Sequence, residues 1–148
     1  MVVVPTAVRA FLNRRTTLEN RITLLSELAA DVLDREPIHE ADLERVAAVL
    51  SEIEEDLAEL IELKQTDGFF SEILSASPES QHTVDQLMED HRSLLADMRH
   101  MQNELSNADH GPSVRRLLHG WVTRFQELDS REIGLLQKIW SVDVGATD

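Results

Sequence analysis

Hydrophobic side chains recur along most of this chain at alternating steps of three and four residues. This spacing gathers them on one side of an α-helix and leaves charged residues on the other side. The pattern runs through four long stretches that are separated by short polar segments. We therefore expect four amphipathic helices, which cover about residues 6–34, 41–66, 80–106 and 113–141.

The separating segments contain residues that commonly end helices or form turns. Pro37 follows the first helix, Ser75-Ala76-Ser77-Pro78 precedes the third, and Asp109-His110-Gly111-Pro112 precedes the fourth. Phe69-Phe70 and Ile73-Leu74 indicate an apolar turn after the second helix. No alternation of period two predicts a strand. The sequence thus predicts a single all-α domain, an up-down-up-down antiparallel four-helix bundle with a short C-terminal tail.

Four polar residues interrupt the apolar sides of these helices. In the third helix the apolar positions 84, 87, 94, 98, 101 and 105 leave one gap, which His91 fills. The apolar sides of the other helices lead to Arg15, Lys64 and Glu132. A buried polar group is costly without a partner, so these residues are candidates for a site inside the bundle.

Antiparallel packing of neighbouring helices predicts which residues lie at the same height. Two positions are level when the midpoint between them falls in the turn that connects their helices. By this criterion one layer across the bundle consists of Arg15, Leu60, His91 and Leu128. Lys64 and Glu132 then lie together one turn away, about 6 Å along the axis.

The order of the helices and three local segments resemble the hemerythrin-like domains, the HHE cation-binding family. The segments are Leu63 to Phe70 with its Asp-Gly-Phe-Phe ending, Asp90-His91-x-x-Leu94, and Leu135-Leu136-Gln137 followed by Asp143-Val144-Gly145. That family holds a non-haem di-iron centre between four helices. Its ligands are a histidine on the first and third helices and a His-x-x-x-Glu pair on the second and fourth. The resemblance implies the same bundle fold here.

Most of the ligands of that family are replaced in this sequence. The matching positions are occupied by Arg15, Leu60, Lys64, His91, Leu128 and Glu132. Only His91 and Glu132 keep side chains that bind iron, and two protein ligands cannot hold two iron ions. The resemblance therefore implies a degenerate metal site without a cofactor. The alternative is a divergent site for non-haem iron or a single metal ion, with Asp129 or Glu62 as further ligands.

The replacing residues suggest how the bundle is stabilised without metal. The two leucines fill with apolar groups the space where imidazoles would lie. Lys64 would form an ion pair with Glu132, with Arg15 or His91 nearby, so that no buried charge lacks a counter-charge. In the alternative interpretation, both long basic side chains extend their charged ends into water at the edge of the bundle.

The composition excludes several classes of partner. The 148 residues include 28 acidic and 14 basic ones, a net charge of −14, so we expect no binding to nucleic acid. We also expect no membrane association, because no apolar stretch is long enough to span a bilayer. Cysteine is absent, which excludes disulfides and thiolate metal sites and favours a cytoplasmic protein.

The sequence contains no recognisable catalytic motif, neither a nucleophile paired with a base nor a glycine-rich phosphate loop. We therefore expect that the protein is not an enzyme. It would act as an interaction or regulatory module that binds an unknown protein partner or forms a homodimer, and a purely structural subunit is the alternative. An exposed apolar patch around Phe69, Phe70 and Trp140 would indicate partner binding.

Overall fold

The computed structural model describes residues 6–35, 38–66, 69–106 and 111–140. All regular secondary structure in these ranges is helical, which confirms the all-α class. The helices are α1 (Thr6–Leu33), α2 (Glu40–Thr66), α3 (Phe69–Ala76), the 3₁₀ helix η1 (Pro78–Ser80), α4 (Gln81–Ser106) and α5 (Gly111–Trp140). The predicted helix end at Pro37, the turn at Asp109 and His110 and the C-terminal tail fall outside the described residues.

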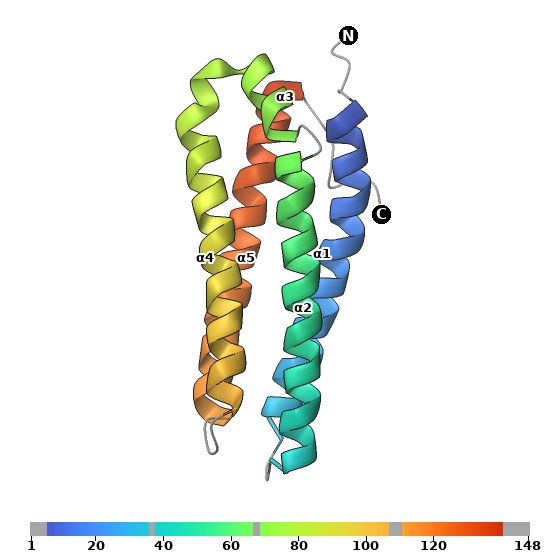
Figure 1. Cartoon of the computed structure of the whole chain (residues 1–148), viewed down its shortest axis with the longest axis vertical. Coiled ribbons are helices and arrows are strands. Elements are labelled where there is room, and N and C mark those ends of the chain that lie inside the picture. Colours follow the sequence, from blue (N-terminus) through green and yellow to red (C-terminus); the bar gives the residue numbers. More distant parts are fainter. Residues whose placement is uncertain (1–5, 36–37, 67–68, 107–110, 141–148) are drawn as a thin grey trace.

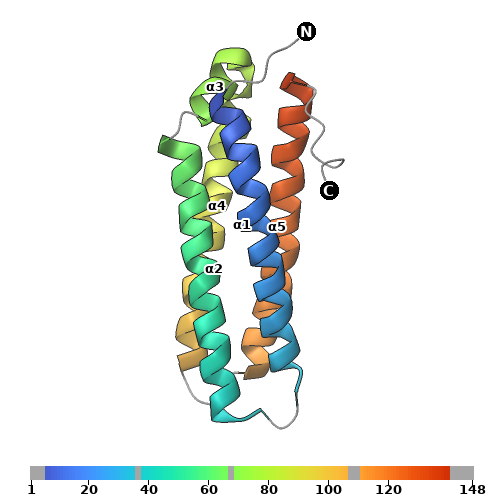
Figure 2. The ribbon, with the colours of Figure 1, turned by 90° about the vertical axis from the view of Figure 1, so that its right-hand side faces the viewer.

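The four long helices lie side by side along the long axis of the molecule (Figure 1, Figure 2). α1 packs against α2 and α5, and α4 packs against the same two helices. The chain colours show that α1 and α4 run in one direction and α2 and α5 in the other (Figure 1). Each packed pair is therefore antiparallel, which brings residues from distant parts of the chain to the same height.

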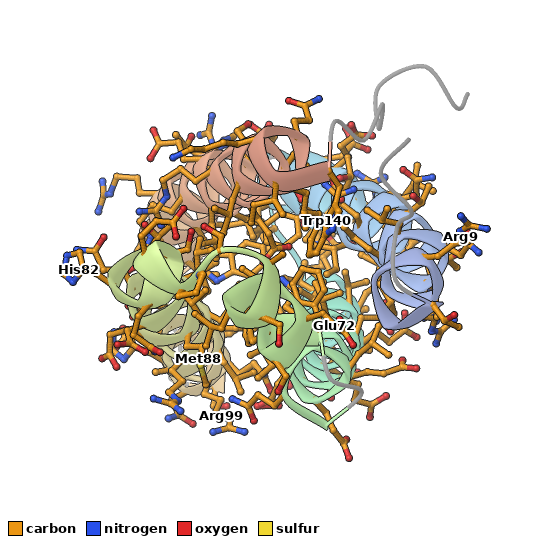
Figure 3. The ribbon with its side chains drawn as sticks, turned by 90° about the horizontal axis from the view of Figure 1, so that it is seen from above. Arg9, Glu72, His82, Met88, Arg99 and Trp140 are labelled. Atoms are coloured by element: carbon orange, nitrogen blue, oxygen red, sulfur yellow. The ribbon has the colours of Figure 1, made fainter. Side chains whose placement is uncertain are left out.

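The apolar sides of the long helices form one continuous core. Large side chains with less than 2 % of their surface exposed come from every long helix and include Leu18, Ile22, Leu50, Ile53, Leu57, Leu87, Met98 and Trp121. Burial of one such side chain stabilises the fold by about 1.5–3 kcal/mol. Charged side chains such as Arg9 and Arg99 lie on the outside when the molecule is viewed along its long axis (Figure 3). None of the described helices is long and apolar enough to cross a membrane.

The short helix α3 lies at one end of the long helices and contacts α1, α2 and α5 (Figure 1). It forms a helix where the sequence suggested an apolar turn, because Phe69, Phe70 and Ile73 share one buried face. Trp140 at the end of α5 is also buried, with 6 % of its surface exposed. These three rings belong to the core, so the exposed apolar patch that would have indicated partner binding is not found at Phe69, Phe70 and Trp140.

The segment around Pro78 is a tight helical turn that leads directly into α4, not a loop. The Ser77 amide donates to the Ile73 carbonyl at 2.8 Å, and the Ser80 amide donates to the Ser77 carbonyl at 2.9 Å. The hydroxyl groups of Ser77 and Ser80 also bond to each other at 2.7 Å. Pro78 suits the first position of η1, where its missing N–H group would have no partner.

Candidate functional site

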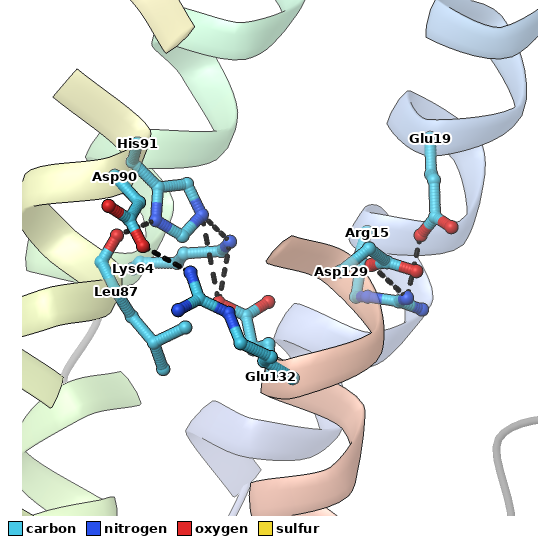
Figure 4. A network of polar contacts seen from close by, with 9 residues as sticks. Arg15, Glu19, Lys64, Leu87, Asp90, His91, Asp129 and Glu132 are labelled. Carbon is cyan, nitrogen blue, oxygen red and sulfur yellow. Dashed lines mark hydrogen bonds and ion pairs between the residues drawn. The ribbon is translucent and has the colours of Figure 1, made fainter. Parts of the chain in front are cut away.

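Lys64, His91 and Glu132 meet in the interior between α2, α4 and α5 (Figure 4). Their side chains are only 3 %, 4 % and 2 % exposed. The Lys64 Nζ atom lies 2.8 Å from Glu132 Oε2 and also contacts His91 Nε2. Glu132 Oε2 is 3.7 Å from the same imidazole nitrogen. The ammonium group thus lies against both an imidazole nitrogen and a carboxylate oxygen.

The hydrogen bonds of His91 determine which ring nitrogen carries its proton. His91 Nδ1 bonds to the Leu87 carbonyl oxygen, one turn earlier on α4, and a carbonyl can only accept. The neutral ring therefore carries its proton on Nδ1, and Nε2 accepts a hydrogen bond from the Lys64 ammonium. Burial, together with the charge of Lys64, lowers the pKa of His91 to about 3, so the ring stays neutral at physiological pH.

Lys64 supplies the positive charge at the centre of this group. Burial lowers the pKa of Lys64 from its ordinary value, because a low-dielectric interior disfavours the charged form. The nearby Glu132 carboxylate opposes this shift. The ion pair compensates two charges that would otherwise be buried at a cost of several kcal/mol each.

Arg15 lies in the same region but has different partners (Figure 4). Its side chain is 6 % exposed, and its guanidinium group forms an ion pair with Asp129 and lies 2.8 Å from a carboxyl oxygen of Glu19. Burial, followed by the hydrogen bond and the charge of Asp129, raises the pKa of Glu19 to about 8, while Arg15 opposes the shift. Glu19 is therefore mostly protonated at pH 7 and shares the guanidinium with the Asp129 carboxylate.

The two groups form one charge-balanced polar layer to which every long helix contributes. Lys64 and Arg15 are the cations, and Glu132 and Asp129, three residues apart on α5, are the anions. The interpretation that the basic side chains end in water does not fit this geometry, because both charged ends are buried. The expected proximity of Arg15 to the Lys64 and Glu132 pair takes the form of a neighbouring ion pair with Asp129.

The residues at the positions where the resemblance would predict metal ligands do not fit a di-iron centre. Leu60 and Leu128 are buried apolar side chains, 3 % and 4 % exposed, and offer no donor atom. His91 and Glu132 are the donors that remain, and both already contact the Lys64 ammonium. Among the residues that the structure describes, no group of three or more His, Asp or Glu side chains is arranged to hold a metal ion.

The two additional ligands considered from the sequence are placed elsewhere. Asp129 faces Arg15, and Glu62 lies on the exposed surface of α2. Asp56 lies in the acidic stretch of α2 but is only 5 % exposed and pairs with Arg21 at 3.3 Å. Burial raises the pKa of Asp56. Asp56 lies seven residues after Val49, which is also buried. This helical spacing is the feature of the sequence from which the burial of Asp56 could have been predicted.

Comparisons of the chain with protein-family models, curated proteins and solved structures find no match.

Proposed function

We propose that this protein is a metal-free bundle of the hemerythrin-like type, in which the Lys64 ammonium group takes the place of the metal cation. One observation carries the proposal. The Lys64 Nζ atom lies where a cation would be held, in contact with His91 Nε2 and 2.8 Å from Glu132 Oε2. These two residues occupy the positions at which the sequence resemblance predicts metal ligands.

The charge arithmetic of this region supports the proposal. Two iron ions need several negatively charged and neutral donors, whereas a single ammonium needs one carboxylate and one neutral acceptor. Glu132 and the Nδ1-protonated His91 provide that smaller set. An ammonium group needs no further donors, which fits the apolar side chains of Leu60 and Leu128 at two of the remaining positions.

The proposed bundle topology is up-down-up-down, and it rests on the directions of the four long helices. α1 and α4 run opposite to α2 and α5, and the connections α1 to α2 and α4 to α5 join packed neighbours. Alternating directions with helices packed in a ring are typical of such bundles.

For this bundle we propose the role of an interaction or regulatory module, without catalytic activity. Lys64, His91 and Glu132 contact one another in the interior, and this role would therefore depend on the exposed faces of the helices. A divergent site for a single metal ion is the competing function, and it would require Lys64 to leave the two donors.

The test compares metal content in two variants of the chain. Protein produced in iron-supplemented medium is analysed for iron, manganese and zinc, and its ultraviolet-visible spectrum is recorded. We expect near-zero metal for the natural chain. A restored variant carries Arg15→His, Leu60→His, Lys64→Glu and Leu128→His, which rebuilds the ligand pattern that the resemblance implies, and we expect it to bind about two irons with an oxo-bridge absorption.

A variant with Lys64→Glu alone is the matched control, because it removes the ammonium without adding histidines. Stoichiometric metal in the natural chain would contradict the proposal. Failure of the folded restored variant to bind iron would contradict the assignment of these positions.

A further inference from the structure

The outer face formed by α4 and α5 carries two regularly spaced ion pairs between the helices, which we call the charged ladder. Arg124 pairs with Asp97, and Arg131 pairs with Asp90. The two arginines are seven residues apart on α5, and the two aspartates are seven residues apart on α4, so both rungs lie on one face. All four side chains are 45–50 % exposed. These aspartates make the α4 edge of this face acidic and the arginines make the α5 edge mainly basic, although Glu127 of α5 also borders it.

Two hollows lie along the groove between these edges. The larger, of about 660 Å³, has Leu94 and Leu128 among its lining residues together with Ser93, Thr123 and Ser130. The smaller, of about 300 Å³, is lined by Leu117 and Gly120. Arg124 borders both hollows, so they lie next to each other along the helix pair. Leu117 is one of the few large apolar side chains with a well exposed surface, at 39 %.

The exposed side of α5 contains two glycines that the packing of this chain does not require. Gly120 lines the smaller hollow together with Arg124, and Gly134 is exposed three residues after Arg131. A Cβ atom at either glycine would meet nothing within 4 Å. Glycine weakens the interior of a helix relative to alanine, so its presence in open space suggests the close approach of another molecule.

We propose that the α4 and α5 face is a self-association interface, on which a second copy of this chain binds about a two-fold axis parallel to the helices. This inference rests on the proposed function and names the partner of the module. Rotation about such an axis keeps every residue at its own height and places α4 opposite α5 of the second copy. Each Arg124 then faces a second Asp97, and each Arg131 a second Asp90.

The same symmetry explains the groove and the glycines. Gly120 is level with residue 101 of α4 if Arg124 is level with Asp97, so the hollow at Gly120 faces the region of His100 in the second copy. His100 is 60 % exposed and borders that hollow within its own chain. Small side chains along the groove let the two helix pairs approach closely.

The size of the face suits a stable dimer. α4 and α5 contain 26 and 30 residues, which correspond to lengths of about 39 and 45 Å, and two adjacent helices are about 20 Å wide. Specific protein interfaces bury roughly 800 Å² on each partner, so the proposed dimer would have to cover nearly the whole of this face.

The first measurement is sedimentation equilibrium of the natural chain over a range of concentrations. We expect a reversible dimer of twice the chain mass, which weakens as salt screens the charged ladder. A monomer at every concentration up to about 1 mM would overturn the proposal.

Two variants then locate the interface. We call them edge-reversed, because in each of them one edge of the face changes the sign of its charge. One carries Arg124→Asp and Arg131→Asp, which makes both edges acidic, and the other carries Asp90→Arg and Asp97→Arg, which makes both edges basic. Each variant alone should associate at least about 100-fold more weakly than the natural chain, because like charges face each other. Mixed together, the acidic and basic variants should form a heterodimer.

The combined variant with all four substitutions addresses loss of folding, because it keeps both ion pairs within the chain. It should dimerise with itself but not mix with the natural chain, whose edges have the opposite signs. Glu59→Arg is the matched surface control, since Glu59 forms a similarly exposed ion pair with Arg14 between α1 and α2. This control should dimerise like the natural chain.

A variant with a larger side chain at the proposed interface tests dimer formation independently of charge. Gly120→Met improves helix propensity, so at concentrations where both chains are monomeric it should unfold at a higher temperature than the natural chain, although its dimer is weaker. Ala47→Met on the exposed surface of α2 is its control and should leave the dimer intact. Dimers that persist in both edge-reversed variants and in Gly120→Met would overturn the assignment of the interface. Metal analysis of the same samples tests the proposed metal-free state separately.

Discussion

The buried ion pair of Lys64 and Glu132 leads to the most direct prediction about stability. In Lys64→Met, the Glu132 carboxylate loses its counter-charge, although its side chain is only 2 % exposed. Of the group, only the neutral imidazole of His91 remains near it, at 3.7 Å. Removal of one member of a buried pair costs about 3–5 kcal/mol, since the remaining charge is uncompensated. Glu132→Gln should cost less, about 2–4 kcal/mol, because the amine can lose its proton and still bond to His91.

The double variant separates the pair from the two single effects. Lys64→Met with Glu132→Gln leaves no buried charge at this point, so we expect a loss well below the sum of the single losses. The coupling free energy should be about 2–4 kcal/mol. Urea unfolding followed by circular dichroism gives each free energy of unfolding, and the dependence on urea shows whether the folded state is unchanged.

The chain offers a matched control for this cycle. Arg14 and Glu59 form an ion pair at 2.6 Å, but their side chains are 44 % and 48 % exposed. The corresponding variants Arg14→Met and Glu59→Gln should show a coupling below about 1 kcal/mol, as exposed pairs do. A coupling for Lys64 and Glu132 no larger than that of the control would refute the reasoning that burial makes this pair strong.

Two further predictions concern protonation. The pKa of Glu19 is raised to about 8 from the ordinary 4.5, so its contribution to the free energy of unfolding is present below pH 4.5 and is lost as pH rises towards 8. Glu19→Gln should therefore be more stable than the natural chain at about pH 9 and gain little at about pH 5. Thermal unfolding at the two pH values measures this difference. The pKa of His91 is lowered to about 3 from 6.5, so its contribution is present above pH 6.5 and is lost as pH falls towards 3. Nitrogen NMR at about pH 5 should show a neutral His91 ring with its proton on Nδ1, and a doubly protonated ring would contradict the assigned hydrogen bonds.

The helical class could be predicted from the sequence, because apolar residues that recur at steps of three and four over a long stretch are compatible with few structures other than a helix. Positions such as Leu50, Ile53 and Leu57 are separated by three or four residues and are completely buried. The register of antiparallel helices is then fixed by the lengths of the connections. That register placed Lys64 and Glu132 at one height, and the structure has their charged atoms 2.8 Å apart.

Other features depend on information that a single sequence lacks. The long side chain of Arg15 can reach several acidic residues, and its pairing with Asp129 and Glu19 depends on the rotation of α1 and α5 about their axes. Asp56 lies in an acidic stretch that reads as a surface, although it is buried beside Arg21. The burial of Phe69 and Phe70 depends on the angle at which α3 returns to the long helices.

The burial of Lys64 has a consequence for how this protein responds to its surroundings. A coordinated ion can be removed by a chelator or exchanged for another element, and a protein that holds one has an empty state. The Lys64 charge is attached to α2 through its own side chain and is 3 % exposed, so it can leave only when that part of the helix moves. This cation is therefore in place as soon as the chain has folded, because it is part of the chain itself.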